Sequence, residues 1–336
     1  MKMTEVLIPK TCKTQRHETD LQNLVTAVTL SCKAISRLLR DGPSSRTNPH
    51  LLTNATGDTQ HAIDIVSNDI LLENIKATES YSVIVSEENE SPILADENSA
   101  GPYCIAFDPL DGSSNIDCNI PTGTIFAIWE RQESMAEISE KDILRPAKDI
   151  VCCGYCVYSA ATELIVVFDG TEPARYILDQ VHDNFRFVSH LQIPVKSKKI
   201  CSVNQGNTHC WNNTTKWIVN TFNSNGYSSR YVGSLVADIH RTLLYGGIYM
   251  YPSIAKPKLR LLYEVAPITK IISEAGGAAL SGVGLDICDL LERIPQSIHE
   301  KTAIVCGCHR DIDIYRNMNT FSELMTKQNF KIEGIE

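Results

Sequence analysis

A series of short apolar runs, rich in β-branched side chains and bounded by polar or turn residues, constrains the fold more than any other feature. Such runs are typical of strands, and they lie at residues 81–85, 103–107, 122–129, 150–158 and 164–168. Apolar residues at helical spacing predict helices at about residues 20–40, around 63–71, and at 214–222, 232–244, 266–274 and 312–325. Because strands and helices intermix, we expect layered α/β sheets with helices packed on them.

Size and charge narrow the possible classes of protein. At about 150 residues per domain, a chain of 336 residues is expected to form about two domains. The pattern places a provisional boundary near residue 200, which gives an N-terminal domain at 1–200 and a C-terminal domain at 201–336. The 31 basic and 40 acidic side chains leave a net charge of −9. Because the sequence has no long basic run, we expect no nucleic-acid partner.

No segment approaches the ~18 uncharged apolar residues that a membrane span needs, and the start of the sequence lacks the apolar core of a signal peptide. We therefore expect a cytoplasmic protein with no membrane partner. The twelve cysteines are scattered, and no second Cys or His pair completes a zinc spacing. We expect reduced, structural thiols.

Acidic residues follow two of the predicted strands directly. Glu87 and Glu88 come after the run at 81–85, and Asp108 and Asp111 come after the run at 103–107. In open α/β sheets, ligands bind outside the carboxyl ends of the strands. If these two strands are neighbours, their four acids share one crevice.

Three further acids are candidates for the same crevice. Glu264 ends the alternating run at 258–263. Asp58 lies within the polar segment 50–62, which we expect to be an exposed, lid-like loop, and Asp64 comes just after it. Two carboxylates 4 Å apart at an effective dielectric of 20 repel by roughly 4 kcal/mol. A few such pairs equal the ~5–15 kcal/mol stability of a domain. Either the acids are dispersed and solvated, or cations hold them; carboxylates without His or Cys suit Mg²⁺ or Mn²⁺.

The residues Gly112-Ser113-Ser114 follow the acidic turn at a predicted loop-to-helix junction. A glycine and two hydroxyls there present N–H and O–H groups that can bind a phosphate. A plain N-cap or β-turn is the alternative interpretation, and only the adjacent acids favour the phosphate.

The segment Asp108-Pro-Leu-Asp-Gly-Ser-Ser-Asn-Ile-Asp117 resembles the metal-binding signature of the sugar-phosphatase superfamily and, in this full form, that of the fructose-1,6-bisphosphatase family. Other segments resemble that family in the same order, from about residue 20 to 325: Asn54–Asp58, Ile63–Asp69, Val85–Glu88, Gly123–Phe126, Arg230–Asp238, Tyr245–Ile248 and Lys258–Glu264. The resemblance implies a layered α-β-α-β-α sandwich, with mixed sheets and helices between and outside them. It also implies divalent-metal-dependent hydrolysis of the 1-phosphate of fructose 1,6-bisphosphate in gluconeogenesis.

The resemblance also implies roles for individual residues. Two to three Mg²⁺ or Mn²⁺ ions would be held by Glu87, Asp108, Asp111, Glu264, the carbonyl of Leu110 and, on loop closure, Asp58. Asp64 and Glu88 would activate the attacking water, and Gly112, Ser113 and Ser114 would receive the 1-phosphate. The rest of the substrate would meet Asn204, Arg230, Tyr231, Tyr251, Lys258 and Arg260. Because similar enzymes take Arg230 from a neighbouring subunit, we expect a homo-oligomer, a tetramer as in those enzymes.

Several of these residues have a structural alternative. Tyr251, beside Pro252, is also placed to cap a strand, and Asn204 is also a common turn residue. Arg260 alternates with leucines and reads as the polar face of a strand, with some role in the crevice.

The sequence departs from family members that AMP regulates. Those enzymes carry Thr-Gly-Glu-x-Thr before the first helix, Lys-Tyr before the metal strand and Arg after Gly-Thr-Ile-Phe. This chain has Glu18-Thr19-Asp20, then Pro102-Tyr103, then Trp129-Glu130. Two cations are missing and a carboxylate replaces one of them, so we expect weak or absent AMP inhibition, unless Arg131 or another base substitutes.

Two rival functions remain open. One is a sister phosphatase acting on sedoheptulose 1,7-bisphosphate, because Glu264-Val-Ala-Pro267 occurs in those enzymes too, although the Arg230-Tyr231 segment favours fructose. The other is a catalytically silent homologue that binds a sugar phosphate or a protein, against which the retention of all seven acids argues.

Overall fold

The computed structural model describes residues 6, 15–40, 52–53, 59–60, 62–97, 99–132, 137–252, 257–281 and 288–333. Asp58 and most of the predicted lid lie outside the described residues. Within the described ranges, no helix is long and apolar enough to cross a membrane.

The first large sheet contains all the predicted strands. Its order is β10-β9-β8-β7-β6-β5-β3-β4, and only β3 and β5 pair in parallel. The strands are β3 (Tyr81–Ser86), β4 (Ile93–Leu94), β5 (Tyr103–Asp111), β6 (Thr122–Glu130), β7 (Ile150–Tyr158), β8 (Thr162–Phe168), β9 (Ala174–Asp179) and β10 (Asn184–His190).

The second large sheet is also mixed and has the order β12-β11-β13-β16-β14-β15. Its strands are β11 (Ile200–Val203), β12 (Ser228–Ser229), β13 (Ile248–Tyr251), β14 (Gly277–Ser281), β15 (Cys288–Asp289) and β16 (Ile304–Cys308). The strand β11 runs parallel to both of its neighbours. A separate antiparallel pair joins β1 (Leu52–Thr53) and β2 (Thr59–Gln60).

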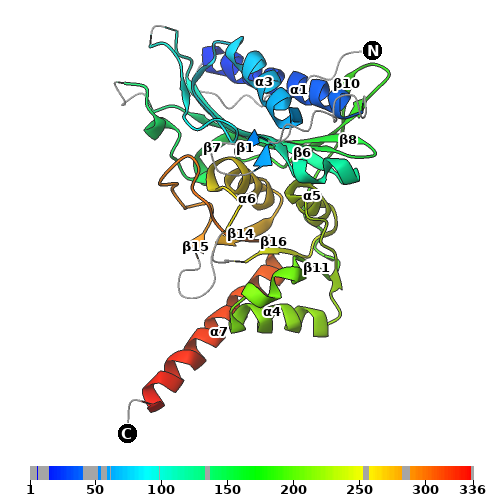
Figure 1. Ribbon diagram of the computed structural model, residues 1–336, viewed down its shortest axis with the longest axis vertical. Helices are drawn as coiled ribbons and strands as arrows, with labels where there is room; N and C mark the ends of the chain where they lie inside the picture. The colour runs from blue at the N-terminus through cyan, green and yellow to red at the C-terminus, as the bar shows by residue number, and fades with distance from the viewer. Residues whose placement is uncertain are drawn as a thin grey trace.

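The helices occupy three positions relative to these sheets (Figure 1). They are α1 (Gln15–Arg40), α3 (Ala62–Lys76), α4 (Asn213–Ser224), α5 (Leu235–Tyr245), α6 (Ala266–Glu274) and α7 (His309–Glu333). Shorter helical turns are η1 (Ser113–Cys118), η2 (Glu140–Asp142), η3 (Ala147–Asp149), η4 (Gln205–Cys210) and η5 (Leu261–Val265).

Three apolar cores hold five layers together. One core joins α1 and α3 to the outer face of the first sheet, the largest fills the space around α5 and α6 between the sheets, and the third joins α4 and α7 to the second sheet. Figure 1 shows the same succession of helices and sheets. The predicted α-β-α-β-α sandwich is therefore confirmed. The boundary near residue 200 stays a prediction.

The strand β5 shows why the sheet can separate two cores. Cys104 and Ala106 face the core between the sheets, whereas Tyr103, Ile105 and Phe107 face α1 and α3. This alternation follows from the two-residue period of a strand. Because both faces are buried, the strand reads as a continuous apolar run.

The strand β5 also corrects one prediction. It does not end at Phe107 but continues to Asp111, with a shift of register against β6 between Asp108 and Asp111. Pro109 has no N–H to give to the ladder, which is why proline in a sheet sits at an irregularity of this kind. The two aspartates therefore lie within the irregular end of the strand rather than in a separate turn.

Candidate active site

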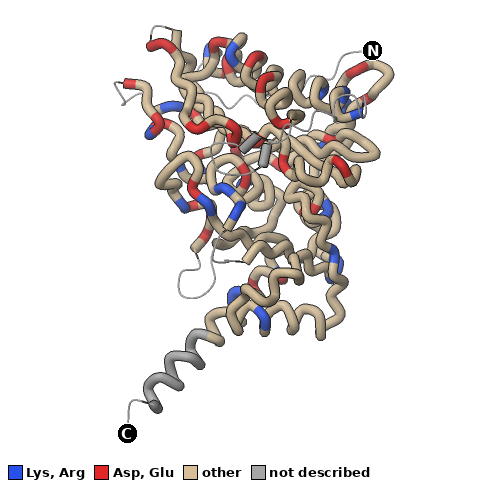
Figure 2. The backbone as a smooth tube through the Cα atoms, in the orientation of Figure 1, with Lys and Arg blue, Asp and Glu red and all other residues tan. Residues whose placement is uncertain are grey.

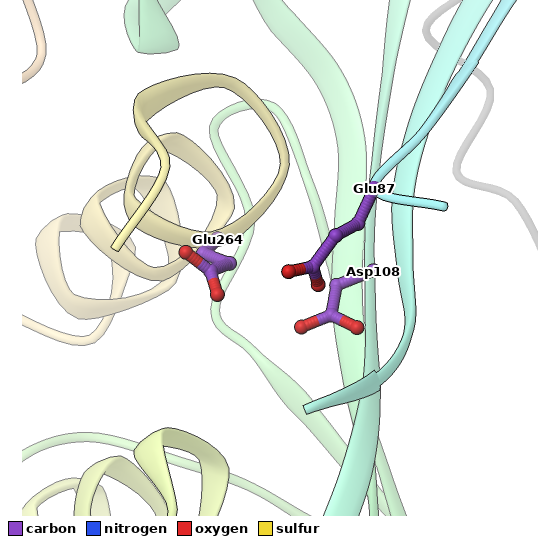
Figure 3. Close-up of side chains that lie close together, drawn as sticks. All are labelled: Glu87, Asp108 and Glu264. Carbon is purple, nitrogen blue, oxygen red and sulfur yellow. The ribbon is translucent and has the colours of Figure 1, made fainter. Parts of the chain in front are cut away.

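Three carboxylates from distant parts of the chain meet at one edge of the first sheet. Side-chain oxygens of Glu87, Asp108 and Glu264 lie within 4.8 Å of one another, and Figure 3 shows the three side chains pointing toward a common space. Glu87 directly follows β3 and Asp108 lies in β5. These two meet because β3 and β5 are parallel neighbours whose carboxyl ends share one edge.

Glu264 reaches the cluster from the layer between the sheets. It lies in η5, a π-helical turn in which all five residues are buried, and this turn packs against β5 and β6. Single π-helical turns often occur at functional sites. The helix α6 follows directly, so its packing between the sheets fixes where Glu264 stands.

Arg260 is the cation of this cluster, and its environment differs from the prediction. Instead of lying on the polar face of a strand, it is 6% exposed, and its Nη1 lies 2.7 Å from Glu87 Oε1. Its backbone N–H donates to Glu264. The run is no regular strand: Arg260 makes one isolated bridge with Lys301. The next three residues are buried on all sides, which suits a helical turn between two layers better than a strand with one exposed face.

Burial and mutual repulsion shape the electrostatics of the cluster. Burial, followed by repulsion from Glu87, raises the pKa of Asp108 well above its usual range. The same two causes raise the pKa of Glu264, and Arg260 offsets part of the shift. One guanidinium cannot balance three carboxylates. The cluster therefore has to take up protons or further cations.

One oxygen of Asp111 faces the start of α5, and Asp111 is not one of the three acids whose oxygens lie within 4.8 Å of one another. Its Oδ2 accepts hydrogen bonds from the Val236 N–H at 3.0 Å and the Ser234 Oγ at 3.3 Å. Burial raises the pKa of Asp111 to about 7, although these hydrogen bonds oppose the rise. Leu110 is buried, and its N–H donates to Asp108 Oδ1 at 2.9 Å; the role of its carbonyl stays a prediction.

The Gly112-Ser113-Ser114 segment joins strand β5 to the helical turn η1, where the sequence predicted a junction between a loop and a helix. Gly112 has φ 76, a left-handed conformation that glycine adopts without strain, and η1 begins at Ser113. Ser113 is partly exposed and Ser114 is exposed. Their hydroxyls are therefore accessible next to the carboxylates.

Asp64 and Glu88 lie on two segments that pack together. Asp64 is in the first turn of α3 and is 2% exposed, whereas Glu88 is half-buried after β3. One turn beyond Asp64, the Asn68 side chain accepts from Ser86 Oγ at 2.7 Å and donates to Asn89 at 3.1 Å. Asn68, which the sequence analysis did not single out, therefore fixes α3 against the segment that bears Glu87 and Glu88.

The predicted substrate residues of the second half form a polar group around β11 and β13. Asn204 caps η4 by accepting from the Gly206 N–H at 3.0 Å, and its side chain lies beside the Tyr231 hydroxyl. Tyr251, at the end of β13, accepts from the Lys258 N–H at 2.9 Å. Burial, followed by repulsion from Asp238 and Tyr251, raises the pKa of Tyr231.

Arg230 and Lys258 are both exposed cations near this group. The Nη1 of Arg230 contacts only the neighbouring Ser229 carbonyl, at 3.2 Å, among the contacts described for it. Arg230 is therefore turned to the surface of the subunit, where a second chain or a ligand can reach it.

The donor set of the acidic cluster fits a hard divalent metal ion. It offers carboxylate oxygens only, as Mg²⁺ and Mn²⁺ prefer. Asp108 Oδ2 is buried and has no hydrogen-bond partner among the described residues. A buried, unpartnered carboxylate oxygen facing two other acids is costly unless a cation binds it.

Comparison with known proteins decides the family. A sequence model described as fructose-1-6-bisphosphatase, N-terminal domain, matches residues 1–190, and one described as its C-terminal domain matches residues 193–320. The chain belongs to the fructose-1,6-bisphosphatase family. It is a phosphoric monoester hydrolase, as the resemblance of its motifs predicted.

Individual fructose-1,6-bisphosphatases are similar over most of the chain. Mouse fructose-1,6-bisphosphatase 1 is 39% identical over 310 residues, covering 88% of this chain and 90% of the mouse protein. The cytosolic enzyme of Brassica napus is 36% identical and covers 93% of both chains. The crystal structure of the Leishmania major fructose-1,6-bisphosphatase in holo form has a TM-score of 0.83 at 35% identity, covering 91% of this chain and 98% of that one.

Proposed function

We propose that this chain hydrolyses the 1-phosphate of fructose 1,6-bisphosphate, giving fructose 6-phosphate and phosphate for gluconeogenesis, and that the reaction needs a divalent metal. The main support is the buried group of Glu87, Asp108 and Glu264 next to the Gly112-Ser113-Ser114 junction. Carboxylates that lack balancing charge, next to accessible N–H and O–H donors, suit a phosphate that is bound together with a cation.

Two to three Mg²⁺ or Mn²⁺ ions are proposed to bind Glu87, Asp108, Asp111, Glu264 and the Leu110 carbonyl, with Asp58 completing the set. When bound, such ions lower the pKa of the attacking water and neutralise charge on the phosphoryl oxygens. Arg260 keeps the Glu87 carboxylate oriented toward the cluster through their 2.7 Å ion pair.

The chain itself contributes the base and the orientation of the substrate. Asp64 and Glu88 are proposed to accept the proton of the attacking water. Gly112, Ser113 and Ser114 hold the 1-phosphate. Asn204, Tyr231 and Tyr251 bind the 6-phosphate, and Lys258 contacts the sugar and this phosphate.

The active assembly is proposed to be a homotetramer in the cytoplasm, with Arg230 of one subunit completing the 6-phosphate site of another. The exposure of Arg230 supports this. One of the similar solved structures is the Leishmania major enzyme in T-state, and the similar plant enzymes are named cytosolic. Figure 2 shows Lys and Arg scattered among acidic positions, which supports a partner other than nucleic acid.

We further propose that AMP inhibits this enzyme weakly or not at all. Glu130 stands where AMP-regulated enzymes carry Arg, and its carboxylate contacts His17 Nδ1 at 2.9 Å. The guanidinium of Arg131 lies 3.4 Å from the buried carboxylate of Asp142. Two charge-assisted contacts are lost at about 1.5–3 kcal/mol each, so AMP should bind more than a hundredfold more weakly. Inhibition by micromolar AMP would contradict this proposal.

Phosphate release from fructose 1,6-bisphosphate and sedoheptulose 1,7-bisphosphate, measured side by side with Mg²⁺, with Mn²⁺ and with EDTA, tests the function. We expect the fructose ester to have the higher kcat/KM and EDTA to abolish turnover. A preference for the sedoheptulose ester would assign the chain to the sister reaction. No release from either ester under any metal condition would favour the silent homologue.

A further inference from the structure

Asp238 is a buried carboxylate outside the acidic cluster. It lies in the first turn of α5, it is 0% exposed, and both of its oxygens accept hydrogen bonds. Oδ1 accepts from Ser202 Oγ at 2.8 Å and from Arg241 Nη2 at 2.6 Å. The Val232 N–H lies 3.1 Å from each oxygen, and the Gly233 N–H lies 3.0 Å from Oδ2.

Three of the four donors that surround Asp238 belong to segments that bear the proposed 6-phosphate ligands, and the fourth, Arg241, lies in α5 itself. Val232 and Gly233 directly follow Arg230 and Tyr231 in the connection between β12 and α5. Ser202 lies in β11, two residues before Asn204. The Asn204 side chain in turn lies beside the Tyr231 hydroxyl. One carboxylate thus joins the two segments on which three proposed phosphate ligands stand.

We propose that Asp238 is a positioning residue for the 6-phosphate subsite and sets how strongly the enzyme prefers a bisphosphate to a monophosphate. The inference rests on the proposed function, because it takes Asn204, Arg230 and Tyr231 as ligands of that phosphate. Asp238 itself does not contact the substrate. It fixes the backbone of the connection that bears Arg230 and Tyr231. This connection contains no helix or strand of its own between β12 and α5, so its position depends on such contacts.

The chemistry of the contacts requires a carboxylate at this position. Every described group that approaches Asp238 is a donor: two backbone N–H groups, one hydroxyl and one guanidinium. An asparagine of the same shape would turn an NH₂ toward at least one of these donors. The part-buried N–H groups of Val232 and Gly233 would then lose an acceptor and the charge that attracts them, so the connection would move away and take Arg230 and Tyr231 with it.

The same end of α5 is also linked to the irregular end of β5 and to η1. Asp111 accepts from the Val236 N–H, and the Asn115 side chain donates to the Gly233 carbonyl at 3.0 Å. Asp238 therefore fixes the phosphate-binding connection to the element that Asp111 caps. This arrangement holds the proposed 6-phosphate subsite at a fixed distance from the proposed 1-phosphate subsite.

The test compares two substrates in wild type and Asp238→Asn. For fructose 1,6-bisphosphate we expect kcat/KM to fall about 100-fold, the size of effect that misplacing a binding group by about 1 Å produces. For fructose 1-phosphate, which lacks the 6-phosphate, we expect less than a threefold change. Isothermal titration with fructose 6-phosphate should show a matching loss of affinity in the variant.

Controls separate positioning from general loss of structure. Asp142→Asn removes another buried aspartate, which contacts Arg131 and the Ser139 N–H, and it should leave the ratio between the substrates unchanged. If Asp238→Asn fails to fold, Ser202→Ala removes one contact without burying an unpaired group, and a threefold to tenfold fall of the ratio is expected from about 0.5–1.5 kcal/mol.

Equal losses on both substrates, in Asp238→Asn or in Ser202→Ala, would overturn the positioning role. Failure of the proposed function would be distinguishable from this outcome, because the wild-type enzyme itself would then release no phosphate from fructose 1,6-bisphosphate.

Discussion

Glu88 is the residue whose proposed role is easiest to separate from metal binding. It is half-buried on the turn after β3, next to Glu87 but outside the three-carboxylate cluster. Its neighbour Asn68 holds that turn against α3. A base at this position can act on the water without being needed to hold the substrate.

Glu88→Gln should therefore lower kcat by about 10²–10⁴-fold, the usual contribution of a general base, while KM changes less than threefold. Steady-state phosphate release measures both constants. Glu90→Gln is the matched control, because Glu90 lies two residues away and is exposed. Near-normal turnover in Glu88→Gln would contradict the assignment.

The raised pKa values of Asp108, Asp111 and Glu264 predict how pH and metal affect stability. In the metal-free folded protein these carboxyl groups keep protons that the unfolded chain loses above about pH 4. The free energy of unfolding therefore falls as pH rises from about 4 toward the pKa of each group in the folded state, which is about 7 for Asp111. A cation that replaces the protons should stabilise more at pH 8 than at pH 6. For one group with a pKa of about 7, as for Asp111, the difference is about 1.4 kcal/mol.

Thermal melts with EDTA and with Mg²⁺ at pH 6 and pH 8 measure this difference. Asp108→Asn should reduce the gain from Mg²⁺ at pH 8. An equal gain in melting temperature at both pH values would show that protons and metal do not compete for these acids.

At the scale of elements, α5 connects the two halves of the molecule. His240 in α5 contacts two strands of the first sheet. Its Nδ1 lies 2.9 Å from the hydroxyl of Tyr155 in β7, and its Nε2 lies 3.3 Å from Oε2 of Glu163 in β8. Arg175 of β9 makes two hydrogen bonds to Glu163, at 2.6 and 2.8 Å. Burial would raise the pKa of Glu163, but the bonds from His240 and Arg175 lower it to about 2.

Glu163→Gln should reduce stability at pH 7 by about 1–2 kcal/mol, the value of a partly screened charge-assisted pair. A lowered carboxyl pKa gives stability that is present above about pH 4.5 and is lost as pH falls toward 2. The difference between variant and wild type should therefore shrink below pH 4. Urea melts at pH 7 and pH 3 test this, with the exposed Glu172→Gln as control; a constant difference would contradict it.

At the scale of the whole molecule, Arg230 tests the proposed sharing of sites between subunits. Arg230→Ala should mainly raise KM, by about tenfold or more, because a contact to the 6-phosphate is similar in the ground and transition states. A large loss of kcat at unchanged KM would contradict this placement.

Mixed oligomers provide the sharper version of this test. If Arg230 acts across an interface, co-expressed and doubly tagged oligomers of Arg230→Ala and Glu88→Gln subunits contain sites with an intact base and a donated arginine. Such mixtures should be more active at low substrate than either variant alone. Mixtures no more active than the average of the two variants would place Arg230 in its own subunit's site.

Five strands of the first sheet, most helices and the layered α/β class could be predicted from the chain alone, because strands buried on both faces read as continuous apolar runs and amphipathic helices show a period of 3.6 residues. The sequence pattern missed β9 and β10, whose outer faces are partly exposed, and the short strands of the second sheet, because their runs of two to five residues are below what a pattern can separate from loops.

Family motifs pointed to every acid of the three-carboxylate cluster. The arrangement of the charges could be seen only in the folded chain. There Arg260 is buried against Glu87, Asp111 accepts from the first turn of α5, and Asp238 accepts hydrogen bonds from the segments next to Arg230 and Asn204. Periodicity records which side of an element is buried. The partner of a buried charge depends on which elements pack together across three layers, and that information is spread over residues far apart in the chain.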